Sequence, residues 1–544
     1  MKLTKLFTIP AVSLFLFLLL SGFGSLGSSA KPERPTSRPQ PESYRHEQDE
    51  SSTQAQSPDG DDEQDPDLPP GTKIDHETYL RLRDEYVALK RGIEPGRPFD
   101  PEARGRAIER MQIQEDELSG KNSFFDSIAN LFGLDLNAGP TWTPLGPAPL
   151  PSGASTFSGR VTSVVVDPTN PNIVYLGAAQ GGVWRSLDGG ASWASIFDNA
   201  QSMAIGALAI APSDHTILYV GTGEFNGCSS CFFGAGVYRI DNADTSAALV
   251  GPINPQITTG NLTSNAFSGR SISKILVHPT DPATIFVATA SGASGMGGNA
   301  LGGIPPMGTR GVYRSTNATA AAASVTFQKL LVTTDNSFDS PPTGNVIVAD
   351  MVMEPGNPNN IVVAVIGQTG GLGGIYRSVN ALSGTPNFSQ ALSLVNGTRV
   401  TLTINKTGAD VTVYAATSET PTNTPGCTAA DSGAIHKSTD GGATWSGQLT
   451  GGGGFCSGQC FYDMPIAVDP TNVNVVYIGG QTSSTCGGVV RKSIDGGASF
   501  ANDSSGLHAD SHAFFFDTTS TIYTGNDGGI WKRSANAAAG STWA

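Results

Sequence analysis

The sequence Gly182-Val183-Trp184-Arg185-Ser186-Leu187-Asp188-Gly189-Gly190-Ala191-Ser192-Trp193 recurs twice further along the chain. It returns as Ile435-His436-Lys437-Ser438-Thr439-Asp440-Gly441-Gly442-Ala443-Thr444-Trp445 and as Val490-Arg491-Lys492-Ser493-Ile494-Asp495-Gly496-Gly497-Ala498-Ser499-Phe500. A basic position precedes Ser-x-Asp-x-Gly-x-Ser/Thr-Trp/Phe in every copy. Ser and Asp side chains bond nearby backbone N–H groups, and glycine supplies the positive φ that a turn needs. Each copy therefore predicts a β-hairpin corner that buries its closing aromatic ring.

Four positions define this corner, and we expect them to serve the turn and not catalysis. They are Ser186, Asp188, Gly190 and Trp193, then Ser438, Asp440, Gly442 and Trp445, then Ser493, Asp495, Gly497 and Phe500. The corners resemble Asp-box repeats, also called BNR repeats. That family includes sialidases, xyloglucan-active glycosidases, sortilin-type receptors and many secreted bacterial propellers. The resemblance implies that the corners lie at the periphery of the blades.

Strand-like segments repeat in a fixed order between the corners. The position of the corner serine is occupied seven times, by Ser186, Ile240, Ser315, Ser378, Ser438, Ser493 and Ser534. Four copies carry asparagine in place of the aspartate, at Asn242, Asn317, Asn380 and Asn536. Seven copies predict an all-β, seven-bladed β-propeller over residues 141–544, whose ring protects its sheet edges. The last copy lacks an outer strand, which we expect residues 141–146 to supply.

The first 140 residues differ in composition from the propeller. Residues 1–30 read as a signal peptide, with Lys2 and Lys5 before an apolar run and a small-residue cleavage site near Ala30. The run is too short for a comfortable membrane span, so no stable membrane insertion is expected and the chain should be secreted, periplasmic or on the cell surface. Residues 31–72 predict a disordered acidic and Pro-rich linker, and residues 73–140 a short helical segment with a connector.

Composition narrows the classes of partner. The chain has 67 glycines, 15% charged residues and a formal net charge of −15, which argues against non-specific nucleic-acid binding. Six cysteines in an exported chain favour disulfides over metal or redox chemistry, with a connectivity that spacing does not fix. No cofactor is expected.

Candidate functional residues lie where the innermost strands of a propeller begin, at the entrance of its central channel. Counting back from each strand-ending turn places ionisable side chains there. The expected ligand-binding residues are Arg160, Arg270, Glu224, Asp350, Tyr462, His508 and His512, and the candidate catalytic residues are Asp463 and Asp510. The segment from His508 to His512, followed by Gly525-Asn526-Asp527-Gly528-Gly529, resembles a pair of motifs found in secreted Asp-box propellers.

Three interpretations of this cluster stay open. His508, Asp510 and His512 would share one face of a strand and could bind a divalent metal ion. Asp463 and Asp510 could instead act as the two carboxyl groups of a glycosidase, about 5–9.5 Å apart. The third interpretation is that ion pairs with Arg160 or Arg270 fill the channel mouth.

The expected function is binding of a glycan or an extracellular protein by a monomer, through the loops of the channel mouth. A glycoside hydrolase is the first alternative, and whether the chain is an enzyme stays open. A sortilin-like sorting or assembly factor is the second. A sialidase is disfavoured, because most arginines occupy the repeated position before a corner and no Tyr–Glu nucleophile pair can be identified.

Overall fold

The computed structural model describes residues 105–114, 150–152, 155–226, 231–259, 262–291, 308–333, 346–367, 371–422, 431–481 and 488–544. The predicted signal peptide, the acidic linker and residues 141–146 lie outside these ranges. Within the predicted helical segment the described residues are 105–114, and they form a helix.

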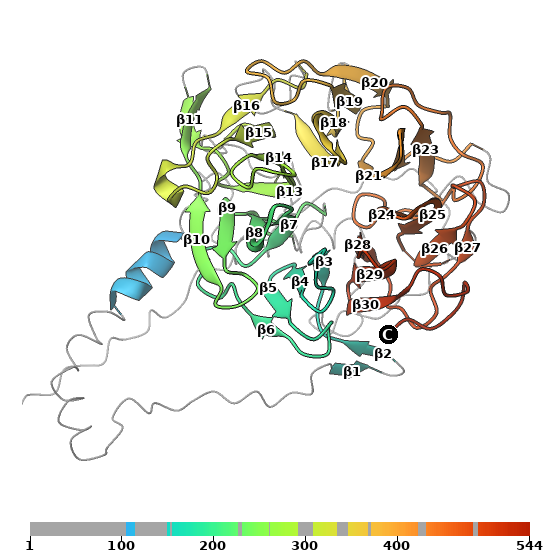
Figure 1. Ribbon diagram of the computed structural model, residues 1–544, viewed down its shortest axis with the longest axis horizontal. Coiled ribbons are helices and arrows are strands. Elements are labelled where there is room, and N and C mark those ends of the chain that lie inside the picture. The colour runs from blue at the N-terminus through green and yellow to red at the C-terminus, as the bar shows by residue number, and fades with distance from the viewer. Residues whose placement is uncertain are drawn as a thin grey trace, which may run out of the picture. The chain divides into compact units, whose positions relative to one another are not determined.

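Seven antiparallel sheets are arranged around a central axis, which confirms the predicted all-β seven-bladed propeller (Figure 1). The first three are β3–β6 (Val161–Val166, Val174–Ala178, Gly182–Ser186, Ala194–Ser195), β7–β10 (Ile205–Ala211, Asp214–Thr222, Val237–Asp241, Ala248–Ile253) and β13–β16 (Arg270–Val277, Ile285–Ser291, Gly311–Ser315, Gln328–Leu330). The fourth and fifth are β17–β20 (Ile347–Glu354, Asn357–Ile366, Gly374–Ser378, Ser389–Ser393) and β21–β23 (Val400–Thr407, Asp410–Thr417, Ala434–Ser438). The sixth and seventh are β24–β27 (Ile466–Asp469, Asn472–Gly479, Val490–Ser493, Ala501–Asn502) and β28–β30 (Ser511–Phe516, Thr521–Asn526, Gly529–Ser534).

Three short elements lie outside the seven blades. The hairpin β1–β2 (Leu150–Ser152, Ser155–Phe157) precedes the first blade, and the hairpin β11–β12 (Gln256–Thr259, Leu262–Asn265) lies between the second and third. A 3₁₀ turn, η1 (Ala322–Ser324), follows β15.

The hydrophobic core lies between neighbouring blades and not within any one of them. One cluster joins Val165 of the first blade to Leu208 and Leu218 of the second. Another joins Val161 and Val164 of the first blade to Tyr523 of the seventh, so that the ring is closed by apolar packing. Each blade is a sheet with two apolar faces, and the ring is the arrangement that buries both of them.

The three corners with a full Ser-x-Asp pattern have the geometry that their sequence predicts. In the first corner, Ser186 Oγ donates to Asp188 Oδ1 over 2.8 Å and accepts from the Gly190 N–H over 2.7 Å. Gly190 has a φ of +99°. Asp188 in turn accepts from the backbone and the hydroxyl of Ser192. The corners at Ser438 and Ser493 repeat these bonds.

The basic residue before each corner links its blade to the next one. Arg185 donates to carbonyls of the second blade, and Arg239 and Arg314 do the same to the third and fourth. Lys437 and Lys492 continue the series. In the seventh blade Arg533, directly before Ser534, pairs instead with Asp503 of the sixth blade, and Lys532, one residue earlier, closes the series by donating to the Gly189 carbonyl of the first blade over 2.6 Å. In the fourth blade Arg377 acts through Asn360, which donates to the Gly441 carbonyl. The repeated basic position therefore links consecutive blades around the ring through hydrogen bonds.

Candidate functional site

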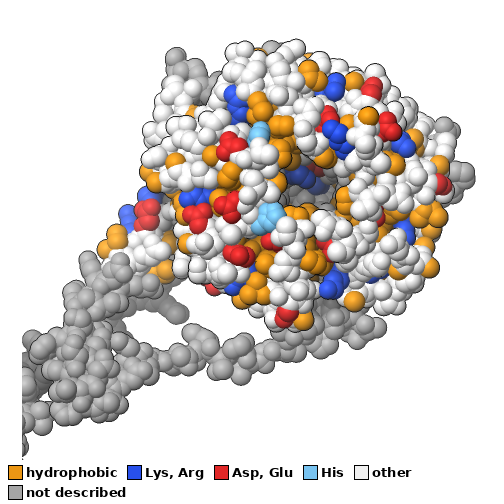
Figure 2. All heavy atoms as spheres, viewed as in Figure 1, with side chains coloured by type: hydrophobic (Ala, Val, Ile, Leu, Met, Phe, Trp, Pro, Cys, Tyr) orange, Lys and Arg blue, Asp and Glu red, His pale blue; other side chains and the backbone are white. Residues whose placement is uncertain are grey.

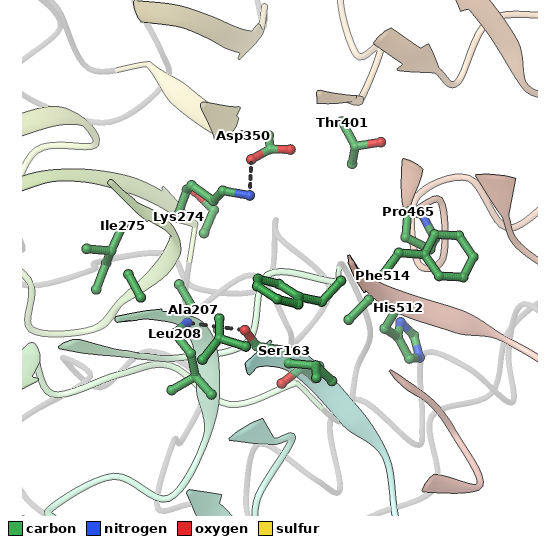
Figure 3. Close-up of a pocket in the computed structure, with 18 of the residues that line it drawn as sticks. Ser163, Ala207, Leu208, Lys274, Ile275, Asp350, Thr401, Pro465, His512 and Phe514 are labelled. Carbon is green, nitrogen blue, oxygen red and sulfur yellow. Dashed lines mark hydrogen bonds and ion pairs between the residues drawn. The ribbon is translucent and has the colours of Figure 1, made fainter. Parts of the chain in front are cut away.

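A cavity of about 550 Å³ lies along the axis of the ring and is lined by all seven innermost strands (Figure 3). Figure 2 shows the hollow at the centre of the face that it views, with basic side chains in its depth. The lining extends from Pro168 and Pro212, in the turns after β3 and β7, to Glu224, Asn226 and Arg399 at the end where the inner strands begin. Between these ends the lining mixes apolar residues such as Ile210 and Phe514 with polar ones such as Lys274 and Asp350.

The hydroxyl groups of the cavity wall are engaged in bonds between blades. Thr162 Oγ1 donates to the Ile205 carbonyl, Ser273 Oγ to the Val348 carbonyl and Thr401 Oγ1 to the Met464 carbonyl, each over 2.6 Å. Ser163 Oγ accepts from the Leu208 N–H over 3.2 Å (Figure 3). These hydroxyls hold the inner strands in register.

Asp350, one of the predicted ligand-binding residues, also links neighbouring blades. Its carboxylate accepts from the backbone N–H groups of Met351 and Leu402, over 2.8 and 2.9 Å. Lys274 Nζ lies 3.2 Å from Asp350 Oδ1 across the third and fourth blades (Figure 3). The charge of Asp350 is therefore compensated within the protein.

Four of the predicted residues meet at the end of the cavity where the inner strands begin. Arg160 donates to Glu224 Oε2 and to the Tyr462 hydroxyl, both over 2.8 Å. The Tyr462 hydroxyl donates to the carboxylate of Asp527 over 2.9 Å, and His512 Nε2 lies 2.6 Å from Asp527 Oδ1. Hydrogen bonds from His512 and Tyr462 and the charge of Arg160 hold the pKa of Asp527 below its usual value, although burial opposes this.

Asp527 also belongs to this cluster, although it was not among the residues predicted from the sequence. The motif from Gly525 to Gly529 was its signal, because that motif follows the second strand of its blade just as Glu224 follows β8.

The segment from Glu224 to Asn226 crosses the end of the cavity. Glu224 pairs with Arg160 of the first blade, whereas Phe225 packs against the core shared by the fourth and fifth blades. Asn226 Nδ2 donates to Glu224 Oε1 over 2.9 Å. On the far side, Arg399 Nη2 donates to Asn226 Oδ1 over 3.2 Å, and the guanidinium lies 5.4 Å from the centroid of the Phe225 ring. One short segment thus connects three blades.

Arg399 was also not selected from the sequence. It immediately precedes β21, as Arg160 precedes β3, and this shared position was the available signal. Burial lowers the pKa of Arg399 to about 10, against the charges of Asp463, Asp350 and Glu224, so the guanidinium stays protonated at neutral pH.

Asp463 and Asp510 lie close enough for their charges to act on each other. The Asp463 side chain is fully buried, with no N–H donor bonded to either oxygen in the described part of the chain. Burial raises the pKa of Asp463 to about 9, with a contribution from the charge of Asp510. The pKa of Asp510 is also raised, first by burial and then by the charge of Asp527. Asp463 is therefore protonated at neutral pH.

The proposed metal ligands His508, Asp510 and His512 do not converge, and that hypothesis is wrong for this structure. Asp510 has a φ of +62° and β28 begins only at Ser511, so the expected alternation along one strand is absent. His508 packs edge-on against Phe157, whereas His512 bonds Asp527. Across the ranges that the structure describes, no group of three His, Cys, Asp or Glu side chains is placed to hold a metal ion.

Arg270 does not join the cluster at Glu224. It is buried at the start of β13, its Nε donates to the Gly308 carbonyl over 2.7 Å, and it does not line the cavity. The sequence placed it correctly at a strand start, but the side chain is directed to the loop before β15.

The described cysteines are oxidised. Cys456 and Cys460 form a disulfide in the loop between the fifth and sixth blades, and Cys231 is disulfide-bonded as well. Among the described residues, no helix is long and apolar enough to cross a bilayer.

No family model and no curated protein matches the chain. Similar solved structures include the GH74 xyloglucanase from Xanthomonas campestris, with 16% identity and a TM-score of 0.45 over 70% of this chain and 52% of that one. The GH74 enzyme of Niastella koreensis is similar with 18% identity and a TM-score of 0.45, over 72% and 54% of the two chains. YCF48 from Cyanidioschyzon merolae is similar with 12% identity and a TM-score of 0.40, over 70% and 97%. The chain spans about half the length of the two GH74 enzymes.

Proposed function

We propose that this propeller is an exported binding module that holds an extracellular protein or glycan at its axial cavity and does not hydrolyse it. The observation that carries the proposal is the state of the candidate catalytic carboxyls. Asp463 is fully buried and its pKa is raised to about 9, chiefly by burial, and the side chain of Glu224 is fully buried against Arg160.

A glycosidase needs two carboxyl groups that face the scissile bond from opposite sides. Their separation is about 5–5.5 Å in retaining enzymes and about 6.5–9.5 Å in inverting ones. The side chain of Asp463 has no exposed surface, so it cannot face a sugar in this arrangement. The remaining cavity carboxylate, Asp350, is occupied by two N–H groups and a lysine. This arrangement favours the ion-pair interpretation of the channel mouth over catalysis.

Export is the second part of the proposal. Residues 1–30 have the composition of a signal peptide, and a disulfide in a loop is typical of an oxidising compartment.

The test compares binding with turnover on the same protein. The purified chain is applied to a glycan array and to a screen of polysaccharide hydrolysis, together with Asp463→Asn and Asp510→Asn. We expect no turnover by any of the three proteins. Hydrolysis by the wild type that either substitution abolishes would contradict the proposal and establish the glycoside hydrolase alternative.

A further inference from the structure

A histidine and a glutamate form a buried pair in the fifth blade, apart from the residues that line the axial cavity. His436 lies in β23 with 5% of its surface exposed, and its Nε2 lies 2.7 Å from Glu419 Oε2. Its Nδ1 lies 3.0 Å from the Ser446 carbonyl oxygen. A carbonyl oxygen and a carboxylate only accept hydrogen bonds, so both ring nitrogens must carry a proton for both bonds to form. The geometry therefore requires the charged imidazolium.

The charge that governs this ring is that of Glu419. Burial lowers the pKa of His436, but the bond to Glu419, its charge and the backbone carbonyl together outweigh burial and raise the pKa above 6.5. The other side chains next to the pair, Thr417 at the end of β22 and Gln448 after the corner, are neutral and bond to Glu419. Lys437, the next residue on β23, lies over the Tyr414 ring and donates to the sixth blade.

Glu419 is ionised over the range in which His436 is charged. Burial raises the pKa of Glu419, but hydrogen bonds from His436 and Thr417 outweigh burial and hold the pKa below 4.5. Both bonds of the ring are therefore complete between the pKa of Glu419 and that of His436. Above the pKa of His436 the ring keeps one N–H, so one of its two acceptors loses its donor.

The pair fixes a segment that is bonded to the channel mouth. Ser418, the residue before Glu419, accepts from the Arg399 N–H over 2.9 Å and donates to the Arg399 carbonyl over 3.0 Å. The Glu419 carbonyl accepts from the Gly433 N–H over 2.8 Å. The Gly433 carbonyl in turn accepts from the Gly454 N–H over 2.8 Å, in the loop that carries the disulfide. A change at Glu419 is thus transmitted to two segments through backbone hydrogen bonds.

We propose that His436 and Glu419 form a pH-dependent clamp, which fixes residues 418–422 in mildly acidic solution and releases them when the imidazolium loses its proton in alkaline solution. The clamp is a conformational device of the fold and does not depend on which ligand the axial cavity binds. A group whose pKa is raised on folding contributes stability that is complete below its unfolded pKa. For His436 that stability is lost as pH rises from about 6.5 through the folded pKa.

Hydrogen exchange on the full chain tests the clamp. The protection factor, which is the exchange rate of an unstructured amide divided by the observed rate, removes the intrinsic dependence of exchange on pH. We expect the protection factors of the Ser418 and Gly433 amides to fall about tenfold or more between pH 6 and pH 9, because a hydrogen bond to a charged group is lost. His436→Gln and Glu419→Gln should show lower protection at pH 6 and a smaller fall. The control His215→Gln, at a His–Asp contact in β8, should keep the wild-type fall.

The protonation of the ring is measured independently, on the wild type alone. Nitrogen chemical shifts of His436 should show both ring nitrogens protonated at pH 6 and a titration midpoint above 6.5. A single neutral tautomer at pH 6 overturns the inference, and so do wild-type protection factors that stay constant from pH 6 to pH 9. Asp463 is retained in His436→Gln, so a fall of wild-type size in that variant would assign the pH dependence to another group and also overturn the clamp. Thermal unfolding at pH 6 checks that each variant is folded, and if one is not, the wild-type measurements decide.

Discussion

The buried carboxyl of Asp463, whose pKa is raised, makes the stability of this protein depend on pH in an unusual direction. A carboxyl whose pKa is raised on folding binds more protons in the folded chain than in the unfolded one. Its contribution to stability therefore declines as pH rises from its unfolded pKa of about 4 toward its folded pKa, by at most about 1.4 kcal/mol for each pH unit. For Asp463 that window extends to about pH 9.

Asp463→Asn keeps the shape of the protonated acid and cannot ionise. We expect its unfolding midpoint to fall less than that of the wild type between pH 5 and pH 9, as measured by thermal unfolding followed by circular dichroism. Asp410→Asn, an exposed aspartate in the turn between β21 and β22, is the control and should follow the wild type. Parallel curves for Asp463→Asn and the wild type would show that Asp463 does not hold a proton in this range.

The Ser–Asp corners are the elements that recur most faithfully, and each depends on one buried serine. Ser438 donates to Asp440 over 2.8 Å and accepts from the Gly442 N–H over 2.9 Å. Ser438→Ala leaves that N–H without an acceptor, so we expect the free energy of unfolding to fall by about 1–3 kcal/mol. Hydrogen exchange at Gly442 should also accelerate. Ser505→Ala, at an exposed serine, is the control, and an equal loss in both variants would contradict this role for Ser438.

The corners should also respond to acid. Hydrogen bonds from Ser192 hold the pKa of Asp188 at about 2, and those from Ser499 do the same for Asp495. Burial opposes the same effect at Asp440, where bonds from Thr444 dominate and the pKa is again about 2. A lowered pKa contributes stability above about pH 4 that is lost as pH falls through the folded value.

We expect the wild type to lose stability between pH 4 and pH 2 more steeply than the triple variant Asp188→Asn, Asp440→Asn, Asp495→Asn. Asparagine keeps part of the turn, as the natural Ser315–Asn317 and Ser378–Asn380 pairs do. Unfolding midpoints in acid measure the difference. If the triple variant falls as steeply, other carboxylates govern acid unfolding.

Strands and corners could be predicted from the sequence because each depends on residues close together in the chain. The placement of Arg160 followed from a single rule, that inner strands begin at one end of the channel, whereas its bonds to Glu224 and Tyr462 were not predicted. The alternation of residues 508, 510 and 512 failed because Asp510 adopts a left-handed conformation before β28 begins. The positions of Arg399 and Asp527 carried a sequence signal, but their bonds to Phe461, Asn226 and Tyr462 could not be predicted, because these partners lie on loops of other blades and no local pattern encodes such contacts.

For the molecule as a whole, stability depends on the series of links between consecutive blades. Lys492 is buried and donates to two carbonyls of the seventh blade, over 2.6 and 3.0 Å. Lys532 donates once, over 2.6 Å, and Lys437 once, over 3.5 Å. All three lie over a tyrosine of the neighbouring strand, so Lys→Met at each position retains most of the packing and removes the bond.

We expect the loss of unfolding free energy to rank Lys492→Met above Lys532→Met and Lys532→Met above Lys437→Met, with about 1–3 kcal/mol for the first two. Chemical denaturation measures the order. A loss at Lys437→Met as large as at Lys492→Met would mean that the stacked tyrosine, and not the carbonyl bond, is what the basic residue provides.

Each blade donates to a backbone carbonyl of the next blade, through a basic residue or, in the fourth blade, through Asn360, so every link around the ring has the same direction. Duplicating or deleting a complete repeat would leave each surviving link with a donor and an acceptor. The links between blades therefore do not determine how many blades the ring contains. We expect the spacing of the inner strands around the axis to determine the number of blades. The width of the axial cavity should therefore change together with the number of repeats when a repeat is gained or lost.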